Sequence, residues 1–292
     1  MNHNKVCPFC GVILQGKRAT QGAKSDEHIM AQWLLDYLAL RKEPVTSQRL
    51  DVPSQRPLEW RQLVADRFVN GRICRACNNG WMSQLEGRVK PILIRLLADP
   101  HELAHLTQEE RRIVATWTAK TAAVLNRAFS FGNPSDPLAH PIPERHLEAI
   151  RSGQLPNDIL VVGSGCPSNW RAGFIENASW AAPHNSIPIQ VPDRERSYKI
   201  GLSLGSLLLG VAYFPNSEYY YVVHQAKHSI LWGSPRRVVI ATDGPIDVSI
   251  VTNLPVLEGF LGNILLVSRT WWALTQNSQQ LHFIAQPRVS QR

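Results

Sequence analysis

The sequence predicts an α+β fold in two parts: a cysteine-organised domain at residues 1–100, and a helical connector with an α+β domain containing an antiparallel sheet at residues 101–292. Three observations support this prediction. Two Cys-x-x-Cys pairs lie within the first part. Thr107 and Glu110 form a capping-box pattern, which begins a helix soon after residue 100. Short apolar segments separated by turn residues dominate the second half, which is typical of antiparallel strands.

The expected elements of the first part are short. We expect, in order, an amphipathic helix at 29–40, a loop punctuated by Pro44, Pro53 and Pro57, a strand or hairpin at 67–73, and a helix after Cys77 that Pro91 kinks or restarts.

In the second part, the capped helix runs through Val124, and a proline-rich loop follows at 131–145. Strands are expected at 159–162, 198–214, 219–224 and 237–241.

The charge distribution favours a nucleic-acid partner. The chain has a formal net charge of +8, and residues 1–100 hold 15 Lys and Arg against 9 Asp and Glu. A basic surface attracts a polyanion because binding releases condensed counterions; an anionic membrane and a plain solvated face are the alternatives. The chain shows neither a signal-peptide stretch nor an apolar run that could span a bilayer, so we expect a soluble cytoplasmic protein without membrane insertion.

The paired cysteines predict a structural zinc site. In a reducing compartment, doubled Cys-x-x-Cys spacing favours metal ligation over disulfides, and it is not the spacing of cysteines that merely fill a core. Two such turns let four thiolates converge on one tetrahedral Zn²⁺, which leaves no coordination position open for chemistry. The expected zinc ligands are Cys7, Cys10, Cys74 and Cys77, whereas Cys166 is expected to be an ordinary thiol.

A second group of polar residues accompanies this zinc site. Glu27-His28-Ile29 lies between the two cysteine pairs, Asn70 precedes the second pair, and Cys77-Asn78-Asn79-Gly80-Trp81-Met82 follows from it. The order of these elements resembles the HNH endonuclease superfamily over roughly the first third of the chain. The CNNGWM stretch looks like a particular bacterial subgroup of those nucleases.

The resemblance implies a ββα-metal nuclease domain with His28 as general base. Glu27 and Asn78 would hold a catalytic Mg²⁺ or Mn²⁺, with Asn79 as the alternative to Asn78, and Asn70 would pin the loop that carries His28. Imidazole has a pKa of about 6.5 and can take a proton from water near neutrality. Carboxylate and amide oxygens are hard ligands that suit such ions, although one of each makes a weak, labile site. The products would carry 5′-phosphate and 3′-hydroxyl ends.

The sequence therefore favours a metal-dependent endonuclease that acts on DNA, and the resemblance alone suggests anti-phage defence. The alternative is a non-catalytic zinc module that binds nucleic acid. Residues 101–292 would position DNA, bind a protein partner or regulatory ligand, or restrain the nuclease. The candidates for phosphate contact are Arg72, Arg75, Arg88 and Lys90.

One complete motif is rejected on its context. His101-Glu102-Leu103-Ala104-His105 matches the HExxH pattern of zinc metalloproteases, which needs a helix presenting both histidines on one face. Pro100 precedes the motif and Thr107 begins a new helix directly after it, so we expect an interhelical connection instead. His224 and His228 are expected at the surface, and Trp271-Trp272 in core packing or in base stacking.

Overall fold

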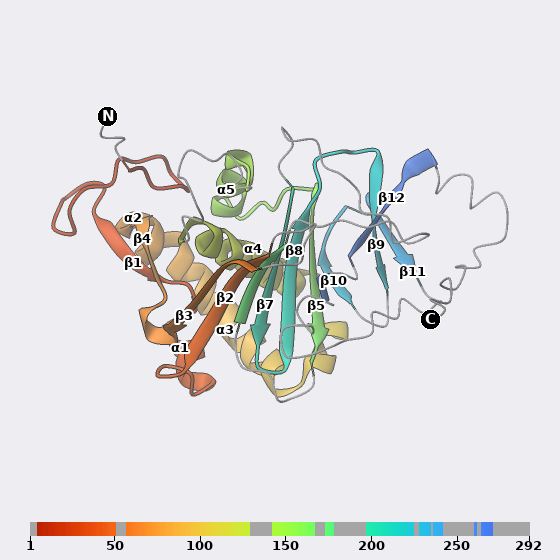
Figure 1. Ribbon diagram of the computed structural model, residues 1–292, viewed down its shortest axis with the longest axis horizontal. Coiled ribbons are helices and arrows are strands. Elements are labelled where there is room, and N and C mark those ends of the chain that lie inside the picture. Colours follow the sequence, from red (N-terminus) through yellow and green to blue (C-terminus); the bar gives the residue numbers. More distant parts are fainter. Residues whose placement is uncertain are drawn as a thin grey trace, which may run out of the picture.

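The largest sheet has seven strands in the order β10-β5-β8-β7-β6-β2-β3, antiparallel except where β2 pairs with β6 (Figure 1). The computed structural model describes residues 5–50, 57–128, 142–166, 173–177, 197–224, 228–234, 236–241, 260–261 and 264–270. In chain order its strands are β2 (Pro44–Leu50), β3 (Pro57–Val64), β5 (Ile159–Gly165), β6 (Gly173–Asn177), β7 (Tyr198–Leu204), β8 (Leu207–Tyr213) and β10 (Ser229–Trp232).

Two smaller sheets and a set of helices complete the described structure. β1 pairs with β4 in an antiparallel ribbon, and β9 lies between β11 and β12. The bounds are β1 (Lys24–His28), α1 (Gln32–Tyr37), β4 (Val69–Cys74), α2 (Arg75–Cys77), α3 (Ser83–Ala98), α4 (Gln108–Ala128), α5 (Glu144–Arg151), β9 (Tyr219–His224), β11 (Val238–Ala241) and β12 (Leu265–Ser268). The mixed α+β class and the antiparallel sheets predicted from the sequence are confirmed.

The central hairpin of β7 and β8 is apolar because both of its faces are covered. All residues of both strands are buried. Successive side chains of a strand point to opposite faces. Accordingly, Leu209 joins the larger core with Trp117 of α4, whereas Leu208 joins a smaller core with Tyr221 of β9. The expected strand at 198–214 is therefore two strands, joined by a turn in which Gly205 adopts a φ of +60°.

Helix α4 lies against the large sheet and also contacts β4 and α3 from the N-terminal part. Its residues from Val114 to Asn126 are all buried, and it packs against α3, α5, β4 and several strands of the large sheet. Helix α3 runs through Pro91 without interruption, so the predicted restart does not occur. No helix among the described residues combines the length and the apolar character that a membrane crossing needs.

Two predictions for the first part are wrong. The segment around Pro44 and Pro57 is a strand pair rather than a loop; each of these prolines is the first residue of its strand, where a missing N–H is tolerated. Pro53 lies outside the described residues. The helix expected at 29–40 is only the six-residue α1, because Ala31 is still extended and Ala39 has a positive φ of 53°.

The division at residue 100 stays a prediction. In the described structure, the seven-stranded sheet combines β2 and β3 with strands from the second part. The larger core likewise contains Leu34 and Leu93 together with Val124 and Leu209. The two parts therefore share a sheet and a core.

The capping box at the start of α4 is confirmed. The Thr107 backbone N–H donates to Glu110 Oε2 at 2.9 Å, and the Glu110 N–H donates to Thr107 Oγ1 at 3.2 Å. We expect Thr107→Ala to lower the free energy of unfolding by about 1 kcal/mol, because the Glu110 N–H loses its acceptor. Urea unfolding followed by circular dichroism measures this loss. Thr107→Ser keeps the hydroxyl and serves as the control; equal stability of the two variants would contradict a capping role.

Candidate functional site

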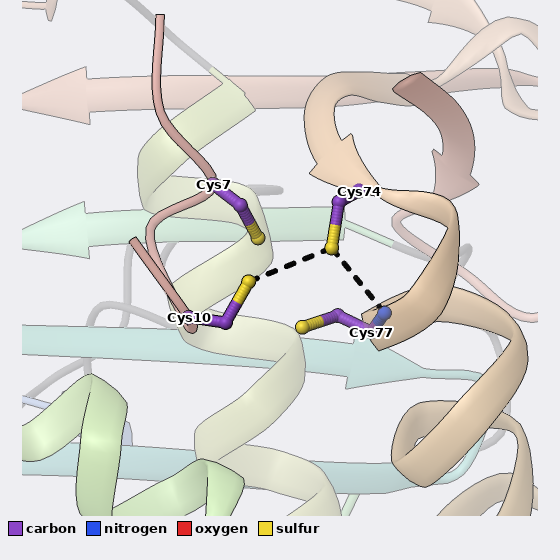
Figure 2. A group of neighbouring side chains, drawn as sticks. All are labelled: Cys7, Cys10, Cys74 and Cys77. Carbon is purple, nitrogen blue, oxygen red and sulfur yellow. Dashed lines mark hydrogen bonds between the residues drawn. The ribbon is translucent and has the colours of Figure 1, made fainter. Parts of the chain in front are cut away.

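Four cysteine side chains from opposite ends of the N-terminal part meet in one cluster. The Sγ atoms of Cys7, Cys10, Cys74 and Cys77 all lie within 4.8 Å of one another (Figure 2). Tetrahedral Zn²⁺ with Zn–S bonds of ~2.3 Å spaces its sulfurs ~3.8 Å apart, so the cluster needs little contraction to hold an ion. The four-cysteine part of the zinc prediction is thus present as a cluster that could bind a metal such as zinc.

Local backbone structure directs each cysteine pair inward. In the first pair, the Cys7 N–H donates to Val12 O at 2.9 Å and the Gly11 N–H donates to Cys7 O at 2.8 Å. Gly11 adopts a φ of +70°, which a residue with a Cβ rarely does. In the second pair, Cys74 ends β4 and caps α2 by accepting the Cys77 N–H on its sulfur at 3.4 Å.

The clustered cysteines shift one another's pKa values. A hydrogen bond from the Cys77 thiol lowers the pKa of Cys7 to about 4. Burial raises the pKa of Cys74 to about 11, and the hydrogen bond to Cys7 raises that of Cys77 well above its ordinary value. One thiolate therefore forms at the expense of its neighbours. A divalent cation would stabilise all four thiolates together, which couples metal binding to folding.

Beside this cluster lies a small pocket of about 190 Å³ with a polar lining. It is lined by Glu27, Asn78, Asn79, Met82, Ser83 and Glu86. Glu27 comes from β1, whereas the other residues come from the π-helical turn Asn78–Met82 and the start of α3. Because Asn78 follows Cys77 directly, the cysteine cluster fixes the position of Asn78 in the pocket wall.

A buried lysine of α4 joins the two carboxylates of the pocket. Lys120 Nζ lies 3.0 Å from Glu27 Oε1 and 2.8 Å from Glu86 Oε1, and the lysine side chain is fully buried. Burial lowers the pKa of Lys120, but the charges of Glu86 and Glu27 outweigh burial and raise its pKa above the ordinary value. Lys120 is therefore a charged group held between two acceptors.

Asn78 is partly buried and oriented by a hydrogen bond. Its amide nitrogen donates to Ser25 Oγ at 2.5 Å, which connects the turn after the second cysteine pair to β1. Among the described residues, no hydrogen bond involves its Oδ1 atom. Asn79, the alternative to Asn78, lines the same pocket.

His28 lies beside Glu27 in sequence but contacts different residues. Its Nε2 is 3.4 Å from Gln32 Nε2 and 3.9 Å from Asp66 Oδ1, and 24% of its side chain is exposed. Consecutive strand residues point to opposite faces, and His28 is not among the residues that line the pocket. The structure thus brings Glu27 and Asn78 together and places His28 at the adjoining edge of β1.

Asn70 is buried and pairs with Glu27 in the β1–β4 register. Its Nδ2 donates to Val124 O of α4 at 2.8 Å, and its Oδ1 accepts the Arg72 N–H at 2.9 Å. Asn70 therefore anchors β4 to α4. The loop that follows His28 is held by a backbone bond instead, from the Ile29 N–H to Phe68 O at 3.0 Å.

The four candidates for phosphate contact have different surroundings. Arg72 lines a larger groove of about 520 Å³ between the first cysteine turn and α5. Arg75 donates to Lys17 O, and Arg88 forms an ion pair with Glu109 at 2.6 Å. Lys90 lies over the Trp33 ring, 5.7 Å from its centroid.

The HExxH segment is a connection between helices, as predicted. Residues Pro100–Ala104 form a 3-10 helix between α3 and α4, and both His101 and His105 are exposed. Among the described residues, the four cysteines form the one cluster of three or more His, Cys, Asp or Glu with metal-binding geometry.

The surface prediction for His228 is wrong. It is buried, and its Nε2 lies 3.0 Å from Phe260 O. The His224 side chain and Trp271-Trp272 lie outside the described residues.

Sequence reasoning missed Lys120 as a member of the site and did not assign Glu86 a role. A signal for Lys120 existed. It lies three residues after Trp117 and four before Val124, so it shares the apolar stripe of a predicted helix. A lysine on a buried stripe needs a buried anionic partner.

No protein-family model, curated protein or solved structure matches this chain.

The cysteine cluster predicts a metal-dependent fold. We expect Cys74→Ser to lose bound zinc and to melt at a lower temperature, because metal binding contributes to folding free energy. Metal analysis of the purified protein and calorimetry measure the two effects. Cys166→Ser is the matched control, since Cys166 lies outside the cluster. Equal zinc content in both variants would exclude the cluster as the zinc site.

Proposed function

We propose that this chain is a metal-dependent endonuclease of the HNH type that hydrolyses phosphodiester bonds of DNA. The observation that carries the proposal is that Glu27 and Asn78, 51 positions apart in the sequence, line one pocket beside the four-cysteine cluster. The antiparallel pairing of β1 with β4, followed by α3, supports a ββα arrangement of this region.

The proposed reaction uses groups on both sides of the end of β1. Glu27 and Asn78 would hold a Mg²⁺ or Mn²⁺ ion, which would offset charge on the phosphate and on the departing 3′ oxygen. The partly exposed His28 imidazole would accept a proton from the attacking water. Asp66 lies 3.9 Å from His28 Nε2 and would stabilise the imidazolium that forms. A phosphodiester bound across the end of β1 would contact both His28 and Glu27.

A second candidate function is favoured by the ion pair between Glu27 and Lys120. Because the lysine already neutralises this carboxylate, the chain could be a zinc-stabilised module that binds nucleic acid without cutting it. In that case Arg72 and Arg75 would contribute affinity through phosphate contacts. A role in anti-phage defence is proposed from the sequence resemblance alone.

A plasmid assay separates the two candidates. We expect nicking of supercoiled DNA with Mn²⁺ or Mg²⁺, and a rate at least ~100-fold lower for His28→Ala, because general-base catalysis contributes about 10²–10⁴-fold. His101→Ala, at an exposed position in the 3-10 helix, is the control and should nick like the wild type. Zinc content and circular dichroism verify that each variant is folded.

DNA binding without nicking by the folded wild type would favour the binding module. Equal nicking by His28→Ala and His101→Ala would remove His28 from the mechanism. Casein hydrolysis that His101→Ala abolishes would support a metalloprotease instead.

A further inference from the structure

The buried Lys120 holds two carboxylate groups in place. Its ammonium contacts Oε1 of Glu27 and Oε1 of Glu86, which are 93 and 34 positions away in the sequence. A buried charge is expensive unless it is paired, so the lysine holds both carboxylates close to one point. The Glu27 side chain is 7% exposed and that of Glu86 is 21% exposed, so neither has much freedom to move away.

Each carboxylate still has a second oxygen to offer. Among the described residues, no hydrogen bond involves Oε2 of Glu27 or Oε2 of Glu86, and the same holds for Oδ1 of Asn78. All three residues line the pocket of about 190 Å³. Three residues with a hard oxygen donor to spare therefore line one small cavity, and such donors are what Mg²⁺ and Mn²⁺ prefer.

The charge balance of the pocket defines what it can bind. Two carboxylates and one ammonium leave a net charge of −1, which attracts a divalent cation weakly and reversibly. Three protein oxygens would leave about three positions of an octahedral ion for water or a phosphate oxygen.

We infer that Glu86 is a third protein ligand of the ion site lined by Glu27 and Asn78, and that the Lys120 ammonium, which is paired with both carboxylates, limits the affinity of the site through its charge. This inference deepens the proposed function and rests on its divalent-ion site.

Titration of the zinc-loaded, full-length protein with Mn²⁺, followed by electron paramagnetic resonance, tests the inference without measuring activity. We expect the wild type to bind one Mn²⁺ and Glu86→Gln to bind it at least tenfold more weakly, since glutamine keeps a hydrogen-bond acceptor for Lys120 but removes the charge. Glu109→Gln is the matched control, because Glu109 is an exposed carboxylate of α4 paired with Arg88 and Arg112. It should bind Mn²⁺ like the wild type.

Lys120→Met tests the effect of the lysine charge. Removing the ammonium changes the net charge of the pocket from −1 to −2, so we expect Mn²⁺ to bind at least severalfold more tightly and to raise the melting temperature more than in the wild type. Unchanged or weaker binding by the folded variant would overturn the role of Lys120. Because two buried carboxylates without a counter-charge can unfold the chain, Glu86→Gln decides the role of Glu86 independently.

Glu27→Gln distinguishes failure of this inference from failure of the proposed function. If Glu27→Gln loses Mn²⁺ binding and Glu86→Gln keeps it, Glu86 is not a ligand and the proposed ion site stands. If the wild type binds no Mn²⁺, the ion site and this inference are both overturned, and the plasmid assay then decides separately whether the chain is a nuclease.

Discussion

The buried ammonium of Lys120 connects the N-terminal ribbon to the long central helix, and the candidate site depends on this connection. The lysine is fully buried on α4, and its charge is balanced by Glu27 of β1 and Glu86 of α3. Asn70 of β4 adds a second tie to α4 through the Val124 carbonyl. Both strands of the ribbon are therefore fastened to a helix that belongs to the second part of the sequence.

The cysteine cluster also fixes the position of residues that line the candidate pocket. It joins the turn at Cys7 and Cys10 to the end of β4, and it places Asn78 at the first position of the π-helical turn. A metal ion with four sulfur ligands would have no open coordination position for catalysis, so the cluster would only hold the surrounding segments in place. A bound metal would cross-link the two cysteine turns, and the buried ion pair of Lys120 anchors β1 and α3 to α4.

The position of His28 gives the proposed chemistry a clear geometric requirement. Glu27 is buried and faces the lysine, whereas His28 is partly exposed and lies near Gln32 and Asp66. In the proposed reaction, a substrate would have to bind across the end of β1 to reach both residues. A base separated in this way from the proposed ion ligand Glu27 would act on water at the edge of the pocket.

Local patterns in the sequence determined much of this protein. The Cys-x-x-Cys spacing, the capping box at Thr107 and the apolar segments between turn residues in the second half each involve residues within a few positions of one another, so they could be recognised from the sequence alone. Local context also correctly predicted that the HExxH segment connects two helices. Only the tertiary structure decided that Lys120 meets Glu27 and Glu86, that His228 is buried, and that β2 joins β6. These outcomes depend on contacts between distant segments. The residues around a charged side chain or a strand do not reveal which distant residue or strand will pair with it.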